Sequence, residues 1–276
     1  TATTTTTAAP PTSRPPTRPL AAARMPATVD AYRGLGTWVD VYDWSVTYGG
    51  PRGGPTVGTA DVDRMAEAGV QTLYVQTARW DTPGDVLEPE RLVPLIRWAQ
   101  ARGIAVVTWY LPTFTDPGAD LRHLLAAARL GVQGLAVDIE SREVPDPAER
   151  TRRLLALSAA LRRELPGEAL GAIVMPPVVT DVINPGYWPG FPWRELVPFY
   201  DIWLPMAYWT NRSGSSGWRD PYRYTIENVT RLRQNLGVAG APVHLIGGIA
   251  DQTSAADVGA MHRGAVEHGV WGASLY

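Results

Sequence analysis

The sequence predicts a (β/α)8 barrel, and three observations support this. Strand-like and helix-like segments alternate from about residue 33 to the end of the chain, with eight strands in all. The first strand ends in Asp-Val-Tyr-Asp-Trp, not in the glycine-rich turn that opens a doubly wound sheet. The segment 134–140 alternates apolar residues with Ala136, Asp138 and Glu140, which suits a strand with one face on helices and its acidic end at a cavity.

The predicted strands are short runs rich in β-branched and aromatic residues, bounded by glycine, proline or polar residues. They cover residues 36–42, 71–76, 104–110, 134–140, 169–175, 202–208, 243–248 and 270–276. The predicted helices cover residues 59–69, 89–102, 119–130, 147–165, 193–199, 221–236 and 254–268. Thr59 as N-cap and Gly69 as C-terminal stop delimit the first of them. The eighth helix is expected to be missing or to lie outside this chain.

Residues 1–26 form a compositionally distinct segment of Thr, Ala, Pro and Arg with almost no large apolar residue. Such a segment buries too little surface to offset its ordering entropy, so we expect a disordered tail or linker before a single barrel domain at 27–276. Thr/Pro tracts of this kind often tether exported domains. We therefore expect a protein that is secreted or associated with the cell envelope, in the latter case with the cell wall.

Composition excludes several chemistries. The chain has no cysteine, which excludes thiol nucleophiles, disulfides and cysteine metal sites, and all 25 basic residues are arginine, which excludes a lysine Schiff base. A net charge of -2 gives no reason to expect a nucleic-acid partner, and no run of 18 apolar residues predicts a membrane span. Neither a cofactor nor a metal is expected. Eleven tryptophans against 3 phenylalanines favour rings that also meet polar groups, as in stacking on sugars.

Candidate site residues lie where the predicted strands end, because the reactive groups of such barrels lie at the carboxyl ends of the strands. The candidate catalytic residues are Glu140, Asp138 and Asp40. The candidate substrate-binding residues are Trp38, Gln76, Trp80, Trp109, Tyr208, Trp209 and Asp251. The mouth is thus predicted to be rich in carboxylates and aromatic rings.

Glu140 is the strongest candidate for a general acid. A partly dry, aromatic-walled cleft disfavours its charged form, and an ionised Asp138 two positions earlier disfavours it again. A glutamate that stays protonated near neutral pH can protonate a leaving group. Protonation of a glycosidic oxygen best fits a site without metal, thiol or lysine, and the usual glycosidase design uses two carboxylates. Asp138 or Asp40 would be the second.

Structural roles compete with these functional ones. Asp138 could accept hydrogen bonds from neighbouring strands, Asp43 is expected to be a turn or cap residue, and His244 is expected to be a hydrogen-bonded core histidine. His262 and His268 are six apart on a predicted helix, so they share no face and make no metal pair. Residues 211–217 form a Ser/Gly-rich loop, either a lid or an ordinary surface loop.

Short motifs resemble two families of sugar-cleaving barrels. Asp40-Val41-Tyr42-Asp43-Trp44 resembles the strand-one motif Asp-Val-Ser-x-Trp of glycoside hydrolase family 25 muramidases, whose fourth strand also ends Asp-x-Glu. Asp138-Ile139-Glu140 is also similar to the end of the family 18 chitinase signature Asp-Gly-x-Asp-x-Asp-x-Glu, and Met206-Ala207-Tyr208 to its strand-six Met-x-Tyr. The resemblance implies a barrel glycosidase in which Glu140 is the acid and Asp138 its neighbour.

Departures from these motifs mark the chain as a divergent relative. Gln133 and Ala136 stand where family 18 has aspartates, and Trp209 replaces the acid that often follows its tyrosine. The last strand ends Leu275-Tyr276 without the tryptophan of that family. The substrate therefore does not carry over from either family.

Three functions remain open from the sequence. The first is a secreted glycosidase acting on a polysaccharide or glycan. The second is a carbohydrate-binding barrel without catalysis, which the missing aspartates favour. The third is a phosphate-binding barrel enzyme, because residues 245–249 resemble the strand-seven loop whose backbone N–H groups bind phosphate in that group.

Overall fold

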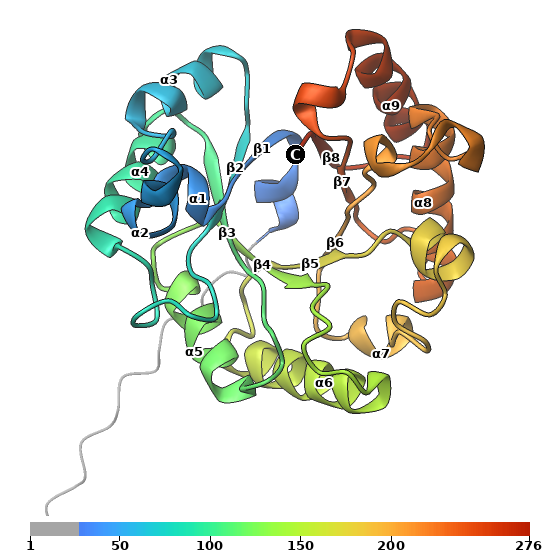
Figure 1. Ribbon diagram of the computed structural model, residues 1–276, viewed down its shortest axis with the longest axis horizontal. Helices are drawn as coiled ribbons and strands as arrows, with labels where there is room; N and C mark the ends of the chain where they lie inside the picture. The colour runs from blue at the N-terminus through green and yellow to red at the C-terminus, as the bar shows by residue number, and fades with distance from the viewer. Residues whose placement is uncertain (1–27) are drawn as a thin grey trace, which may run out of the picture.

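The computed structural model describes residues 28–276, whose eight strands are all parallel and lie in the order β6-β5-β4-β3-β2-β1-β8-β7. The predictions for residues 1–26 and for Ala27 fall outside the described residues. The strands are β1 (Gly34–Val39), β2 (Thr72–Gln76), β3 (Ala105–Tyr110), β4 (Gly134–Ile139), β5 (Leu170–Val174), β6 (Ile202–Pro205), β7 (His244–Ile246) and β8 (Gly272–Ser274). Two isolated bridges, Trp203 to Val243 and Met206 to Ile246, join β6 to β7. The sheet thus closes into the predicted (β/α)8 barrel (Figure 1).

Helices surround the barrel, each following a strand. The α-helices are α1 (Val41–Trp44), α2 (Val46–Gly49), α3 (Thr59–Glu67), α4 (Pro89–Ala101), α5 (Pro117–Ala128), α6 (Pro147–Glu164), α7 (Trp193–Leu196), α8 (Pro221–Leu236) and α9 (Ala255–Glu267). The remaining turns are η1 (Val29–Tyr32), η2 (Gly50–Arg52), η3 (Val179–Ile183), η4 (Trp209–Asn211), η5 (Gly214–Ser216) and η6 (Ala250–Gln252). Four of the longer helices, α3, α4, α6 and α8, begin at the predicted residue, with Pro147 and Pro221 at N1 after the capping aspartates Asp146 and Asp220. The other two differ slightly, since α5 begins at Pro117 and α9 at Ala255. The predicted N-cap Thr59 is wrong, because Gly58 is the N-cap of α3 and Thr59 is its first helical residue.

The ring of helices is open between α3 and α9, outside β1 and β8 (Figure 1). No helix among residues 28–276 covers this face, so Leu35 of β1 is 46% exposed although its strand is part of a closed barrel. An apolar groove of about 410 Å³ lies there, lined in part by Leu35, Val258, Val266 and Trp271. No helix in the described part of the chain is long and apolar enough to cross a bilayer.

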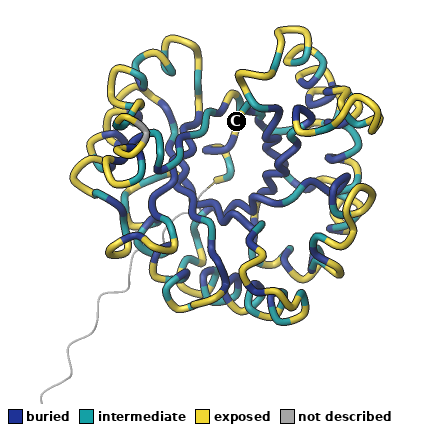
Figure 2. The backbone as a smooth tube through the Cα atoms, in the orientation of Figure 1, coloured by how far each residue is buried: buried dark blue, intermediate teal, exposed yellow. Residues whose placement is uncertain are grey.

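Strand side chains alternate between the barrel interior and the helices, as their period of two requires. In β4, Leu135, Val137 and Ile139 pack outward into the core under the helices, while Ala136 packs with the residues inside the barrel. Buried residues accordingly follow the strands, and exposed residues lie on the outer ring (Figure 2). The next two inward positions of this segment, Asp138 and Glu140, therefore reach the carboxyl end of the barrel.

Tyr32 closes the opposite end of the barrel. It lies in η1, it is fully buried, and its hydroxyl donates to the carbonyl oxygens of Leu135 (2.9 Å) and Ala169 (3.0 Å). Gly134 and Gly171 make room for the ring, since a Cβ at either would lie about 3 Å from Tyr32 atoms. This plug leaves the carboxyl end as the open end of the cylinder.

Several strands end earlier than predicted. The first strand ends at Val39 because Asp40 caps α1 instead of continuing the ladder. The sixth ends at Pro205, after which Ala207 N donates back to Pro205 O and Tyr208 N to Met206 O. In both places the chain turns to follow the rim of the barrel. The directions of side chains at the rim therefore do not follow from strand alternation alone.

Candidate active site

A cavity of about 610 Å³ opens at the carboxyl end of the strands. Most of the predicted site residues line it: Trp38, Asp40, Gln76, Trp80, Trp109, Asp138, Glu140 and Tyr208. They come from β1, β2, β3 and β4 and from the segments that follow β1, β2, β4 and β6. The barrel therefore gathers side chains that are up to 170 residues apart (Trp38 to Tyr208) around one space.

Asp138 and Glu140 form the acidic centre of the cavity. Asp138 is 6% exposed, and its buried Oδ1 has no hydrogen-bond partner among the described residues. Burial raises the pKa of Asp138 well above its usual value, and the neighbouring Glu140 raises it further. Burial also raises the pKa of Glu140. The pair therefore holds a proton more tightly than two exposed carboxyls would, and it titrates as a unit.

Aromatic rings form the walls around this pair. Trp38 stacks on Tyr74 with ring centroids 4.2 Å apart and planes 9° apart, and Trp109 meets Trp38 edge-on at 6.0 Å. The ring centroid of Tyr276 lies 6.3 Å from that of Trp38 and 5.7 Å from that of Tyr208. Burial, followed by the charge of Asp138, raises the pKa of Tyr208 well above its usual value. Its phenol therefore stays a hydrogen-bond donor beside the acids.

Tyr187 braces the end of β4. It lies in the long loop after β5, and its hydroxyl donates to the backbone oxygen of Glu140 at 2.7 Å. Burial, and then the charge of Glu140, raises the pKa of Tyr187 to about 12. Arg142 also lines the cavity and lies over the Tyr187 ring at 5.2 Å. The loop after β5 thus fixes the backbone that carries the candidate acid.

Asp40 lines the cavity but also caps a helix. Its Oδ1 accepts from Tyr42 N at 2.7 Å, and Asp43 accepts from Asp40 N at 3.0 Å, which completes a capping box for α1. The expected cap role of Asp43 is therefore confirmed. Gln76 accepts from Val41 N at 3.1 Å, so this amide also orients the turn after β1.

Two predicted site residues do not reach the cavity. Trp209 is 1% exposed and packs in the core against Gly247 and Gly248, because the chain has left strand geometry and turns its indole toward β7. Asp251 is exposed in η6 and does not line the cavity. The structure therefore does not bring these two residues to the cavity as predicted, since strand alternation does not extend into these turns.

Three backbone amides of the loop after β7 already donate to other parts of the chain. Gly247 N donates to Ser274 O (2.7 Å), Ile249 N to Thr210 Oγ1 (3.0 Å) and Ala250 N to Tyr276 O (2.8 Å). A Cβ at Gly248 would lie 2.7 Å from the Trp209 indole, so close packing explains this glycine. The geometry gives the phosphate-binding alternative no support.

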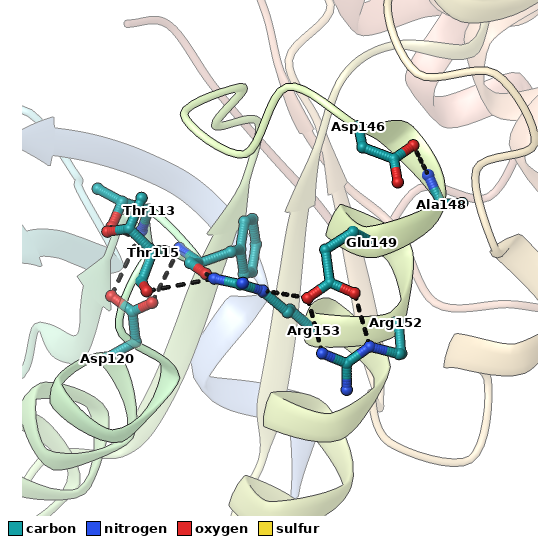
Figure 3. Close-up of polar contacts among 9 residues, drawn as sticks. Thr113, Thr115, Asp120, Asp146, Ala148, Glu149, Arg152 and Arg153 are labelled. Atoms are coloured by element: carbon teal, nitrogen blue, oxygen red, sulfur yellow. Dashed lines mark hydrogen bonds and ion pairs between the residues drawn. The ribbon is translucent and has the colours of Figure 1, made fainter.

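The loop after β3, which carries Thr113 to the cavity, is held from two helices (Figure 3). The buried carboxylate of Asp120 in α5 accepts from Phe114 N (2.9 Å), Thr113 N (3.3 Å) and the Tyr110 hydroxyl (2.8 Å). Arg153 of α6 donates to the carbonyl oxygens of Phe114 (2.8 Å) and Thr115 (3.2 Å). Neither anchor was predicted, because both depend on contacts between separate helices.

Several lining residues were missed from the sequence: Thr113, Arg142, Tyr187 and Tyr276. Tyr276 follows the last strand, and its position at a strand end was a usable signal. Tyr187 lies in an irregular loop, where no periodicity indicates a direction. Within residues 28–276, no group of three or more His, Cys, Asp or Glu side chains is arranged to hold a metal ion.

Comparison with known proteins yields structural but no sequence relatives. No family model matches the chain, and no curated protein matches its sequence. A broad-specificity endoglucanase from Clostridium longisporum superposes with a TM-score of 0.62 at 15% identity, covering 91% of this chain and 88% of that one. A catalytic-site mutant of chitinase active domain 2 from Pyrococcus furiosus gives 0.61 at 13%, covering 91% and 84%. The Bacillus cereus spore cortex-lytic enzyme SleL gives 0.60 at 10%, covering 88% and 70%.

These structural neighbours are glycoside hydrolases, and they share the barrel fold with this chain. At such low identities the likeness shows the fold alone, and this fold hosts many chemistries. Any assignment of function must therefore come from the cavity.

Proposed function

We propose that the protein is a glycoside hydrolase that cleaves a polysaccharide or glycan, with Glu140 as the general acid. The observation that carries the proposal is the pair Asp138 and Glu140, with raised pKa values, in an aromatic-walled cavity at the open end of a barrel. A protonated carboxyl there can donate to a glycosidic oxygen, and the indoles offer flat faces to sugar rings. The short motifs shared with family 18 and family 25 enzymes, and the glycosidase neighbours, are consistent with this assignment.

Each residue has a distinct role in the proposal. Glu140, the outer member, transfers the proton of the pair to the leaving group, and the buried Asp138, on which charge is costly, holds that proton on the pair until then. The unpartnered Oδ1 of Asp138 also offers an acceptor to a donor group of the bound sugar. Asp40, one oxygen of which caps α1, holds substrate or activates water with the other. Trp38, Trp80 and Trp109 stack on sugar rings.

The test replaces Glu140 and measures hydrolysis across a panel of bacterial and plant glycans. E140Q should lose at least about a hundredfold in kcat, the usual contribution of a general acid, while it still binds the glycan. E143Q is the matched control, because Glu143 also lines the cavity but is exposed and lies four residues beyond the end of β4 at Ile139. An E140Q rate equal to that of wild type would refute the assignment.

A carbohydrate-binding barrel without catalysis is the second candidate. It is favoured by the capping role of Asp40, which leaves only the adjacent Asp138 and Glu140 fully available among the predicted acids. Saturable glycan binding by wild type, equal in E140Q and without turnover of any glycan in the panel, would establish this alternative.

We further propose that the protein acts outside the cytoplasm, either secreted or at the cell envelope. The basis is the Thr/Pro-rich composition of residues 1–26. Fractionation of the producing cells tests this, and recovery only from the cytoplasm would contradict it.

A further inference from the structure

A column of hydrogen-bonded side chains runs through the barrel beneath Trp38. Trp38 Nε1 donates to Ser274 Oγ at 2.8 Å, and Ser274 Oγ lies 3.0 Å from His244 Nε2. His244 Nδ1 lies 2.8 Å from the backbone oxygen of Tyr32, the residue that plugs the far end. Ser274, His244 and Tyr32 are at most 1% exposed. The column therefore links the cavity wall to the floor of the barrel.

The chemistry of the end groups fixes the direction of every bond. A carbonyl oxygen only accepts, so Nδ1 of His244 must carry the hydrogen and Nε2 must be bare in the neutral ring. Ser274 then donates to Nε2 and accepts from Trp38 Nε1–H. Burial lowers the pKa of His244 to about 4, which keeps the ring neutral at ordinary pH. Each polar group in the column is thus satisfied in only one arrangement.

The neighbouring strands leave room for this column. A Cβ at Gly272 would lie 2.4 Å from His244 Nδ1 and 2.3 Å from Tyr32 O, and a Cβ at Gly36 would lie 3.0 Å from His244 Cε1. Both glycines lie next to the column in the strand ladders, Gly272 opposite His244 and Gly36 opposite Ser274. Apolar and aromatic side chains such as Tyr74, Val107 and Leu204 also pack inside the barrel.

We propose that Ser274 and His244 are positioning residues that set the orientation of the Trp38 indole for the ligand of the cavity. Stacking on Tyr74 fixes the plane of the Trp38 indole, but the same plane is compatible with two ring orientations. They are related by a half-turn about the Cβ–Cγ bond, which exchanges the two edges of the indole. Only one of the two orientations brings Nε1 to Ser274. The column thereby selects which edge of Trp38 faces the cavity. The ligand part of this inference rests on the proposed function, whereas the orientation of the indole does not.

The first test observes the column in the wild-type protein without ligand. Nitrogen-15 NMR should show His244 with its hydrogen on Nδ1, and the Trp38 indole N–H, assigned with W38F, should exchange slowly with solvent. A hydrogen on Nε2 of His244 would overturn the proposal without the need for any variant.

The second test removes the Ser274 hydroxyl. S274A should speed exchange of the Trp38 indole hydrogen about fivefold, the factor that corresponds to one hydrogen bond, and S274T should restore slow exchange. T108V is the matched control, because Thr108 is a buried hydroxyl on a strand face outside the column. Unchanged exchange in S274A, or equal acceleration in T108V, would overturn the proposal.

The third measurement concerns the ligand, with soluble β-1,4-linked hexasaccharides of glucose, mannose and N-acetylglucosamine as probes. S274A should raise KM, or Kd if no turnover occurs, about fivefold with kcat unchanged, and S274T should return it to the wild-type value. A loss in kcat alone would contradict positioning of a binding platform. Failure of wild type to bind or cleave any glycan, with the NMR results as expected, would refute the proposed function and leave the positioning of Trp38 supported.

Discussion

Asp138 and Glu140 are two positions apart on one segment, yet their surroundings differ. Asp138 is almost fully buried and has an unpartnered oxygen, whereas Glu140 is partly exposed at the mouth. Charge on the inner group is therefore costly, and the outer group has access to a ligand. This asymmetry suits a pair in which the outer carboxyl transfers a proton and the inner one controls when it leaves.

The interaction between the two carboxyls predicts a change in titration. In E140Q the like charge is gone, so the pKa of Asp138 should fall relative to wild type, yet burial should hold it above 3.8. Carbon-13 NMR of the Asp138 carboxyl across the pH range measures this directly. A pKa that is unchanged or raised in E140Q would show that the two groups do not interact. E143Q should leave the titration of Asp138 unchanged.

At the scale of one element, the loop after β3 shows how a rim segment is held in an unfavourable conformation. The backbone angle φ of Phe114 is +62°, in the left-handed region that a residue with a side chain adopts only at a cost in free energy. The ring of Phe114 is fully buried. Asp120 and Arg153 bind the backbone on both sides of it (Figure 3). Hydrogen bonds from Arg152 and Arg153 lower the pKa of Glu149 to about 2. The bond from Arg153 to Glu149 also orients the Arg153 side chain toward the loop.

This conformation predicts an inverted order of stability for two variants. F114A loses the buried ring and keeps the strain, so it should cost about 3–5 kcal/mol in the free energy of unfolding. F114G loses the same ring but relieves the strain, so it should be about 1 kcal/mol more stable than F114A. Urea denaturation of both measures the difference. In α5, A126G should show the ordinary order, with glycine less stable than alanine by about 1 kcal/mol. Equal stabilities at 114 would contradict the strain.

At the scale of the whole molecule, local patterns were sufficient for the fold but not for the entire site. Alternation in 134–140 predicted both the outward apolar face and the inward acids, because that segment is a regular strand. Alternation failed at Trp209, where the chain turns after Pro205. Tyr187 and Tyr32 were missed as contacts of β4, because their positions follow from closure of the barrel and not from neighbours in sequence.

The buried column couples the stability of the barrel to pH. The pKa of His244 is about 4 in the folded chain against 6.5 for an ordinary histidine, so the unfolded chain binds more protons between these values. Stability from the neutral ring is therefore present above pH 6.5 and is lost as the pH falls toward 4, by about 3 kcal/mol at most. The acid pair acts in the opposite direction, because raised carboxyl pKa values favour the folded state as the pH falls.

A variant that cannot titrate at position 244 separates the two effects. H244N should be less stable than wild type at pH 7, because the column is broken, but its free energy of unfolding should fall less steeply between pH 6.5 and 4, by about 3 kcal/mol over the window. The acid pair is unchanged in both proteins, so its contribution cancels in the difference between the two urea-denaturation series. H262N, on the exposed side of α9, controls for the loss of a histidine as such. Parallel curves for wild type and H244N would show that His244 gains no proton on unfolding, which would contradict a neutral ring locked between Ser274 and Tyr32.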